Sequence, residues 1–199
     1  MGATMTVAPT NTPTWPVPPD GGWTAEDLDG LPDLPPHTEL LDGNLVFMSP
    51  QRNFHYAAVS LLHYGLLQAR PEEFKAVREM SLVLDKRDRP EPDVMVVHAE
   101  AMRDRTQTFY RPEDVVLAVE VVSPDSMERD EELKPRKYAA AGIKHYWLVE
   151  NENGEPVVHV YELDPVARSY ESKGAHRGVL NLSAPFPLTI DLGRMDDWS

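Results

Sequence analysis

Two stretches of strand length, residues 92–97 and 115–122, consist almost entirely of apolar residues. The first reads Pro-Asp-Val-Met-Val-Val and the second reads Val-Val-Leu-Ala-Val-Glu-Val-Val. A strand with one face in water alternates apolar and polar residues, whereas a strand covered on both faces is apolar along most of its length. Both runs therefore predict buried strands, and a sheet of such strands needs helices on its two faces. We expect one α/β or α+β domain.

The flanking sequence contains elements that could complete and cover this sheet. Residues 39–48 predict a hairpin, because Asp42-Gly43 is a favoured two-residue turn. Residues 53–69 carry apolar residues at spacings of three and four, which predicts a helix with one apolar stripe. A second helix is expected at 130–141. Further strands are expected at 74–84, at 143–149, at 157–163 and within the proline-punctuated region 168–190.

The distribution of the 19 prolines among the 199 residues suggests where the domain begins. Residues 1–22 are too rich in proline for a helix or a central strand, so we expect a Pro-rich, disordered arm. Residues 23–192 are expected to form the domain, and residues 193–199 a short acidic tail. The arm could also be an interaction segment, since its prolines preset an extended shape for a partner's groove.

The formal net charge of -14 first argues against a nucleic-acid partner, because phosphate binding favours Lys and Arg. The charge is unevenly distributed, however. Residues 1–50 contain no Lys or Arg and carry half of the net charge. A divalent metal would neutralise further carboxylates in the middle of the chain. The composition therefore does not exclude a nuclease, although it predicts weak nonspecific DNA affinity.

Several classes of protein are excluded or disfavoured by residues that the chain lacks. With no cysteine, it has no disulfide scaffold, no thiolate zinc site and no cysteine nucleophile, and it fits a reducing compartment such as the cytoplasm. No apolar run is long enough to span a membrane, and no signal peptide is evident. The sequence has no phosphate loop and no Gly-x-Ser-x-Gly elbow.

Glu120 is the only charged residue in its apolar run, and Asp93 is the only one in the other run. A carboxylate in a buried strand loses solvation, which costs several kcal/mol unless it is paired or binds a metal. Either residue could reach water at a strand end or pair with a structural arginine. If the two strands are neighbours, Asp93 and Glu120 could instead hold Mg²⁺, which favours one or two carboxylates together with waters.

The helix expected after the Glu120 strand carries two lysines, Lys134 and Lys137, on roughly one face. A lysine ammonium near a metal site could orient a water or stabilise the charge that develops on a phosphate. Most lysines on a surface helix are simply solvated, so both interpretations stay open. Pro135 is tolerated only in the first turn of a helix, which suggests that the regular helix begins near residue 134.

These residues carry a resemblance to a known family. The chain resembles the Uma-two family of predicted restriction endonucleases, in the PD-(D/E)XK nuclease superfamily, over about residues 24–192. The matching residues are Arg89-Pro90-Glu91-Pro92-Asp93-Val94, the run Ala118-Val119-Glu120-Val121-Val122-Ser123-Pro124-Asp125-Ser126, then Asp130, Lys134, Tyr138-Ala139, Ala141-Gly142-Ile143 and His145-Tyr146-Trp147.

The resemblance implies a restriction-endonuclease-like fold: a central mixed sheet of about four or five strands flanked by helices. It implies an active site at Asp93 and Glu120. The superfamily lysine would stand at Val122, and in this family it corresponds to Lys134, with Lys137 as the second choice. The same resemblance suggests Glu39 as an additional metal ligand and His55 as a further site residue, although a buried helix histidine is an alternative for His55.

We expect from this a Mg²⁺-dependent endonuclease that hydrolyses DNA phosphodiester bonds, with Mn²⁺ as a possible substitute. Asp93, Glu120 and the backbone carbonyl of Val122 would hold the metal. The alternative is a nuclease-fold binding or interaction module with little or no catalysis. A cluster of arginines at 103, 105 and 111 could grip phosphates or be merely solvated. A homodimer is expected if both strands of a duplex are cut.

Overall fold

The computed structural model describes residues 17–198. The expected Pro-rich arm therefore lies outside the described residues, except for 17–22. Helical segments are α1 (Asp27–Gly30), α2 (Asn53–Ala69), α3 (Lys134–Ala141), the 3-10 turns Ala99–Ala101, Pro112–Asp114 and Leu192–Trp198, and a π-helical turn at Arg129–Leu133. Strands are β1 (Glu39–Leu41), β2 (Asn44–Val46), β3 (Phe74–Arg78), β4 (Ser81–Leu82), β5 (Val94–His98), β6 (Phe109–Tyr110), β7 (Val115–Val121), β8 (His145–Glu152), β9 (Glu155–Asp164), β10 (Ser169–His176), β11 (Val179–Leu182) and β12 (Leu188–Asp191).

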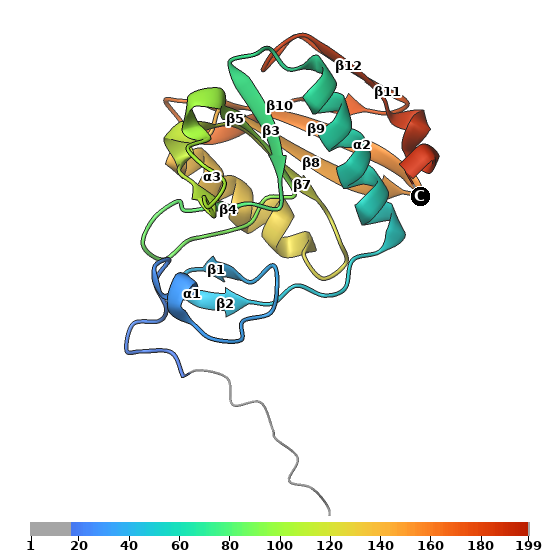
Figure 1. Cartoon of the computed structure of the whole chain (residues 1–199). Helices are drawn as coiled ribbons and strands as arrows, with labels where there is room; N and C mark the ends of the chain where they lie inside the picture. The colour runs from blue at the N-terminus through green and yellow to red at the C-terminus, as the bar shows by residue number, and fades with distance from the viewer. Residues whose placement is uncertain (1–16, 199) are drawn as a thin grey trace, which may run out of the picture.

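A six-stranded mixed sheet forms the centre of the fold, in the order β10-β9-β8-β7-β5-β3 (Figure 1). Strands β7 and β8 are parallel, and the other neighbouring pairs are antiparallel. The parallel pair requires a crossover, which α3 provides. The predicted mixed α+β fold is confirmed, with six strands in the sheet where the resemblance implied four or five.

Both apolar runs are strands covered on both faces, as predicted, and the structure shows that they are neighbours in the sheet. All seven residues of β7 are buried. Leu117 and Val119 belong to the core beneath α2, whereas Ala118 belongs to a second core that includes Tyr138 of α3. Because successive residues of a strand face opposite sides, Glu120 lies on the α3 side together with Ala118.

Three predicted elements differ in detail from the structure. The strand expected at 74–84 breaks at Glu79, which has a left-handed φ of 52° and donates its backbone N–H to the carbonyl of Asp93. The helix expected at 130–141 is regular only from Lys134, as the position of Pro135 predicts, and it ends at Gly142 in the left-handed conformation. The expected tail packs on the domain up to Trp198, since Met195 is buried and Trp198 contacts the core beneath α2.

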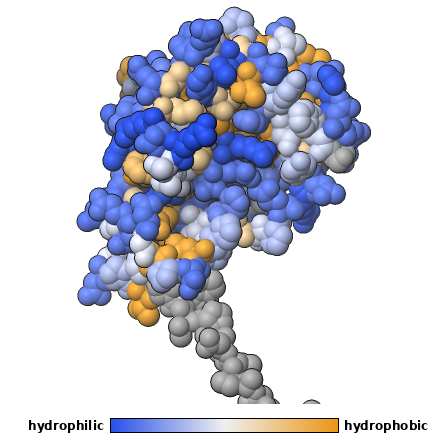
Figure 2. All heavy atoms as spheres, viewed as in Figure 1, coloured by the Kyte–Doolittle hydropathy of each residue, from blue (hydrophilic) through white to orange (hydrophobic). Residues whose placement is uncertain are grey.

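The surface is that of a protein with its apolar residues inside. The face shown in Figure 2 is mostly hydrophilic, with hydrophobic residues in small separate groups. Within residues 17–198, no helix combines the length and the apolar character needed to cross a bilayer.

Gly65 marks a close approach between α2 and the hairpin of β11 and β12. A Cβ atom at this position would lie 2.6 Å from both Cδ1 and Cγ1 of Ile190. We therefore expect Gly65→Ala to lower the free energy of unfolding by about 1–3 kcal/mol through overpacking, although alanine is the better helix former. Urea unfolding measures the change.

The matched variant is Gly65→Ala combined with Ile190→Val, which removes the nearest methyl group. It should recover part of the loss. If Gly65→Ala alone is as stable as the wild type, the close approach imposes no constraint on the helix.

Candidate active site

Asp93 and Glu120 lie side by side on neighbouring strands. Val94 pairs with Val119 in the antiparallel register of β5 and β7, and one further step places Asp93 opposite Glu120. The backbone N–H of Val121 donates to Asp93 Oδ2 at 2.6 Å, which fixes the Asp93 carboxylate against the end of β7. The structure thus brings together the two carboxylates that the sequence suggested as metal ligands.

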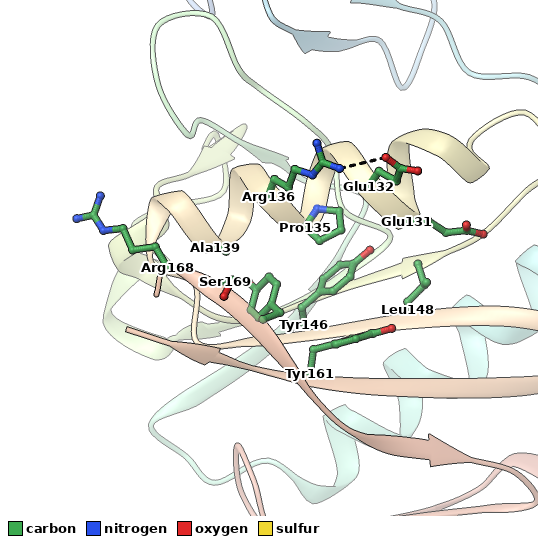
Figure 3. A pocket seen from close by; sticks show the side chains of 11 residues that line it. Glu131, Glu132, Pro135, Arg136, Ala139, Tyr146, Leu148, Tyr161, Arg168 and Ser169 are labelled. Carbon is green, nitrogen blue, oxygen red and sulfur yellow. Dashed lines mark hydrogen bonds and ion pairs between the residues drawn. The ribbon is translucent and has the colours of Figure 1, made fainter. Parts of the chain in front are cut away.

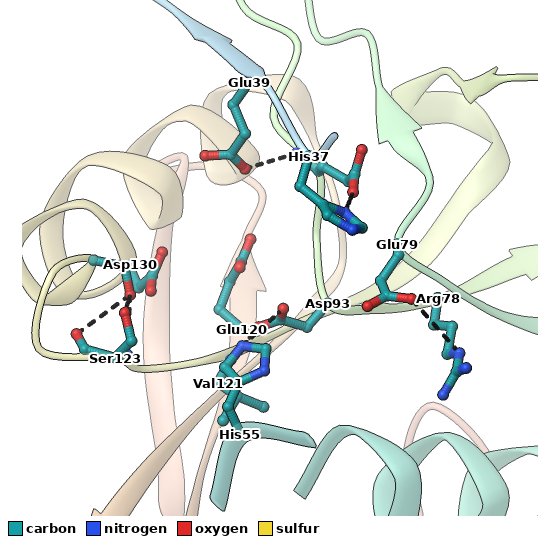
Figure 4. A network of polar contacts seen from close by, with 12 residues as sticks. His37, Glu39, His55, Arg78, Glu79, Asp93, Glu120, Val121, Ser123 and Asp130 are labelled. Atoms are coloured by element: carbon teal, nitrogen blue, oxygen red, sulfur yellow. Dashed lines mark hydrogen bonds and ion pairs between the residues drawn. The ribbon is translucent and has the colours of Figure 1, made fainter. Parts of the chain in front are cut away.

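Lys134 occupies the centre of a buried group of carboxylates (Figure 4 shows the acidic side chains). Its Nζ lies 2.9 Å from Glu39 Oε1, 3.0 Å from Glu120 Oε2 and 3.2 Å from Asp130 Oδ1. Each of these four side chains is at most 3% exposed. The sequence analysis assigned no role to Asp130. Its spacing of four residues from Lys134 could have indicated an ion pair between them.

Local structure explains how these side chains meet. Glu39 begins β1, and its Oε1 also accepts the backbone N–H of Glu91 at 2.8 Å. Asp130 lies in the π-helical turn, where the hydroxyl of Tyr146 donates to the Asp130 carbonyl at 2.6 Å. Turns of this kind are rare in proteins, and those that occur often lie at functional sites. Tyr138, one turn after Lys134, donates its hydroxyl to Glu120 Oε1 at 2.6 Å.

The cluster has more negative than positive charge. One ammonium faces three carboxylates, and Glu39 Oε2 is buried without a hydrogen-bond donor among the described residues. Burial raises the pKa of Glu120 well above its usual range, although Lys134 opposes the shift, and burial also raises the pKa of Asp130. Burial lowers the pKa of Lys134, but Glu120, Glu39 and Asp130 outweigh it and the net shift is upward.

His55 supports Asp93 from the first turn of α2. Its Nε2 lies 3.1 Å from Asp93 Oδ1, and the side chain is 10% exposed. Burial lowers the pKa of His55, but the hydrogen bond and charge of Asp93 outweigh this effect, so the pKa is raised. His55 thus faces the site, where it can hold the Asp93 carboxylate in place.

A pocket of about 500 Å³ opens beside these groups. Asp93, Glu120, Val122, Lys134 and His55 all line it, whereas Glu39 does not line it and contacts two lining residues, Lys134 and Glu91. Among residues 17–198, no group of three or more His, Cys, Asp or Glu side chains is arranged to hold a metal ion. Any metal here would depend on two carboxylates and backbone or water oxygens.

Glu91 is a pocket residue to which the sequence assigned no role. Burial raises its pKa, although its ion pair with His37, at 2.5 Å from His37 Nδ1 to Glu91 Oε1, opposes the shift. Since the backbone of Glu91 also holds Glu39, this pair links the segment before β1 to the pocket.

Lys137, the second candidate for the lysine, lies away from the pocket. Its Nζ lies 2.6 Å from Asp42 Oδ1 and 2.9 Å from Asp88 Oδ2, so it ties the turn of the β1–β2 hairpin to α3. The arginines at 103, 105 and 111 also do not line the pocket, and the Arg111 guanidinium lies over the ring of Phe109.

A second hollow, of about 300 Å³, lies between α3 and the strands β8, β9 and β10 (Figure 3). Tyr146, Tyr161 and Tyr170 line it, and the rings of Tyr146 and Tyr170 stack with their centroids 5.5 Å apart. Tyr146 is buried, like its neighbour Trp147, so both belong to the core. None of the candidate site residues lines this hollow.

Comparisons with known proteins show the family and the fold of the chain. Residues 25–193 match the model of the Uma2 family, described as "Putative restriction endonuclease". A crystal structure described as a putative nuclease belonging to DUF820, from Anabaena variabilis, has a TM-score of 0.64 and 18% sequence identity. The alignment covers 88% of this chain and 98% of that chain, and it shows a shared fold. No curated protein is significantly similar.

The raised pKa of Glu120 predicts a stability change in Glu120→Gln. Because the folded chain disfavours the charged carboxylate, the wild type loses stability as the pH rises above the usual glutamate value of about 4.3. Glutamine avoids this loss. We therefore expect the stability of the variant relative to the wild type to increase from pH 4 to pH 8, on top of the pH-independent loss of its contact with Lys134.

Urea unfolding of both proteins at pH 4 and at pH 8 measures this change. The matched control is Glu155→Gln, at an exposed position of β9, and it should change stability little at either pH. A difference in stability between Glu120→Gln and the wild type that is the same at both pH values, or that moves against the variant at pH 8, contradicts the prediction.

Proposed function

Because the chain belongs to the Uma2 family, whose description is that of restriction endonucleases, we propose that it is a Mg²⁺-dependent endonuclease that hydrolyses DNA phosphodiester bonds. The observation that carries the proposal is the pairing of Asp93 and Glu120 on neighbouring strands at a pocket, with Lys134 Nζ 3.0 Å from Glu120. This arrangement joins two hard anionic ligands to a fixed positive charge.

The residues at the pocket fit a magnesium ion by their chemistry. Asp93 and Glu120 would supply carboxylate oxygens, and Val122, which also lines the pocket, would supply its backbone carbonyl. Mg²⁺ keeps several waters and needs only one or two carboxylates. The excess of buried negative charge around Lys134 also favours a divalent cation. When bound, Mg²⁺ supplies Lewis-acid polarisation of a phosphoryl oxygen.

The role of Lys134 follows from its protonation. Its pKa is raised, so at neutral pH it is an ammonium, which donates hydrogen bonds and accepts none. Lys134 therefore cannot abstract a proton from water. It can orient a water through that water's oxygen, and it can offset negative charge that develops on the phosphate. Glu39 and Asp130 hold the ammonium in position for this task.

The alternative function is a binding module with the same fold and little catalysis. It is favoured by Val122 at the position of the superfamily lysine, and by the fact that Lys134 and Tyr138 engage both oxygens of Glu120. This alternative predicts neither metal-dependent cleavage nor Mg²⁺ or Mn²⁺ binding that depends on Asp93.

The test is cleavage of supercoiled plasmid and linear duplex DNA by the purified chain with Mg²⁺ or Mn²⁺. Asp93→Asn and Glu120→Gln should abolish cleavage, and Lys134→Gln should slow it by about 100-fold or more, in the range found when one transition-state donor is removed. Lys137→Gln is the matched control, because this lysine contacts Asp42 and Asp88 outside the pocket.

Calorimetry with Mn²⁺ separates the two functions. Binding that is lost in Asp93→Asn, together with cleavage by the wild type, supports the nuclease. Cleavage that persists unchanged in Asp93→Asn and Glu120→Gln excludes this site as its origin, and a wild type without cleavage or metal binding leaves the binding module.

A further inference from the structure

Two arginines at the pocket have no acidic partner within residues 17–198. Arg52 immediately precedes α2, and Arg129 is the first residue of the π-helical turn. Both line the pocket that contains Asp93 and Glu120. Neither side chain makes a hydrogen bond or an ion pair with any residue in the range 17–198, and Arg129 Nε is buried without an acceptor.

The lack of partners is unexpected in so acidic a chain, which has 33 Asp and Glu against 19 Lys and Arg. A buried donor without an acceptor is energetically costly, and native proteins usually satisfy it with protein, water or a bound ion. Acidic side chains outnumber basic ones in the pocket. The acidic residues are Glu91, Asp93, Glu120, Asp125, Asp130, Glu131 and Glu150, and the basic residues are Arg52, Arg129 and Lys134.

The N-terminal end of α2 also attracts anions. The helix has 17 residues, no side-chain cap and no acidic residue in its first turn. Its first backbone N–H groups therefore lack a carboxylate to complement them, and the helix dipole favours negative charge at this end. Phe54 and His55 of this turn line the pocket together with Arg52, so the helix begins beside the two arginines.

We propose that Arg52 and Arg129 bind backbone phosphates of the nucleic-acid strand on either side of the bond that is cut at Asp93 and Glu120. The inference rests on the proposed function, and it identifies the groups that hold the substrate. Guanidinium groups bind phosphate oxygens in pairs of parallel hydrogen bonds. Such contacts fix the position of the strand without reading its sequence, and here they offset the repulsion of the acidic pocket.

The arginines of the connection between β5 and β7 give a matched comparison. Arg103 and Arg105 are exposed and do not line the pocket. Replacing both by glutamine removes the same charge as replacing Arg52 and Arg129. The two double variants therefore separate a local phosphate contact from the general loss of positive charge.

The experiment measures binding of labelled single-stranded and duplex oligonucleotides by fluorescence anisotropy, with Mg²⁺, in chains that carry Asp93→Asn to prevent cleavage. Adding Arg52→Gln and Arg129→Gln should weaken binding of at least one form by about tenfold or more and lower the salt slope by about two, since two phosphate contacts are lost. Adding Arg103→Gln and Arg105→Gln should change affinity by less than about threefold.

Equal losses for the two double variants, or a loss only in the Arg103 and Arg105 variant, overturn the inference. So does the absence of binding to either oligonucleotide at low salt. The proposed function is judged separately by wild-type cleavage: binding that depends on Arg52 and Arg129 without any cleavage rejects the nuclease and keeps the phosphate site. If the wild type cleaves DNA but the substitutions at Arg52 and Arg129 leave the oligonucleotide affinity unchanged, only the phosphate site is rejected. Urea unfolding checks that every variant folds.

Discussion

The ammonium of Lys134, buried among three carboxylates, is the interaction on which the rest of the structure depends. Through Glu39 it fastens the N-terminal hairpin, through Glu120 the central strand, and through Asp130 the π-helical turn. Removing one partner from a buried ion group typically costs about 3–5 kcal/mol, because the remaining charges are left uncompensated. Apolar burial stabilises the sheet and the helices packed on its two faces. The buried charges fix the positions of the hairpin and of the π-helical turn relative to the sheet.

The sequence predicted the parts of the fold that hydrophobic patterning controls. The runs around Val94 and Val119 predicted strands covered on both faces, as observed, whereas their adjacency is known only from the structure. Patterning says less about peripheral elements. Strand β10 is mostly polar, and its pairing with β9 depends on backbone hydrogen bonds that any sequence can make. The break at Glu79 depends on a tertiary contact with the carbonyl of Asp93, which no local pattern contains.

The candidate site was predictable to the same extent. Asp93 and Glu120 stood out because charge is costly in buried strands, but Lys134 and Lys137 share one helical face and spacing could not separate them. Long-range contacts decide between them: Asp42 and Asp88 hold Lys137 outside the pocket, while Glu39 and Glu120 hold Lys134 inside. Asp130 carried no signal of burial, since it lies among charged neighbours in a segment that reads as a solvated helix.

The contacts between the β1–β2 hairpin and α3 determine when the site can form during synthesis. Its turn contacts α3 across 95 positions of the chain, between Asp42 and Lys137. During synthesis the hairpin leaves the ribosome long before α3 exists, so Glu39 and Asp42 stay in water until both lysines arrive. Contacts this distant in sequence form late, because the long loop between the two residues must lose conformational entropy before the contact can stabilise the chain. A growing chain would therefore carry an incomplete candidate site until its last third begins to emerge.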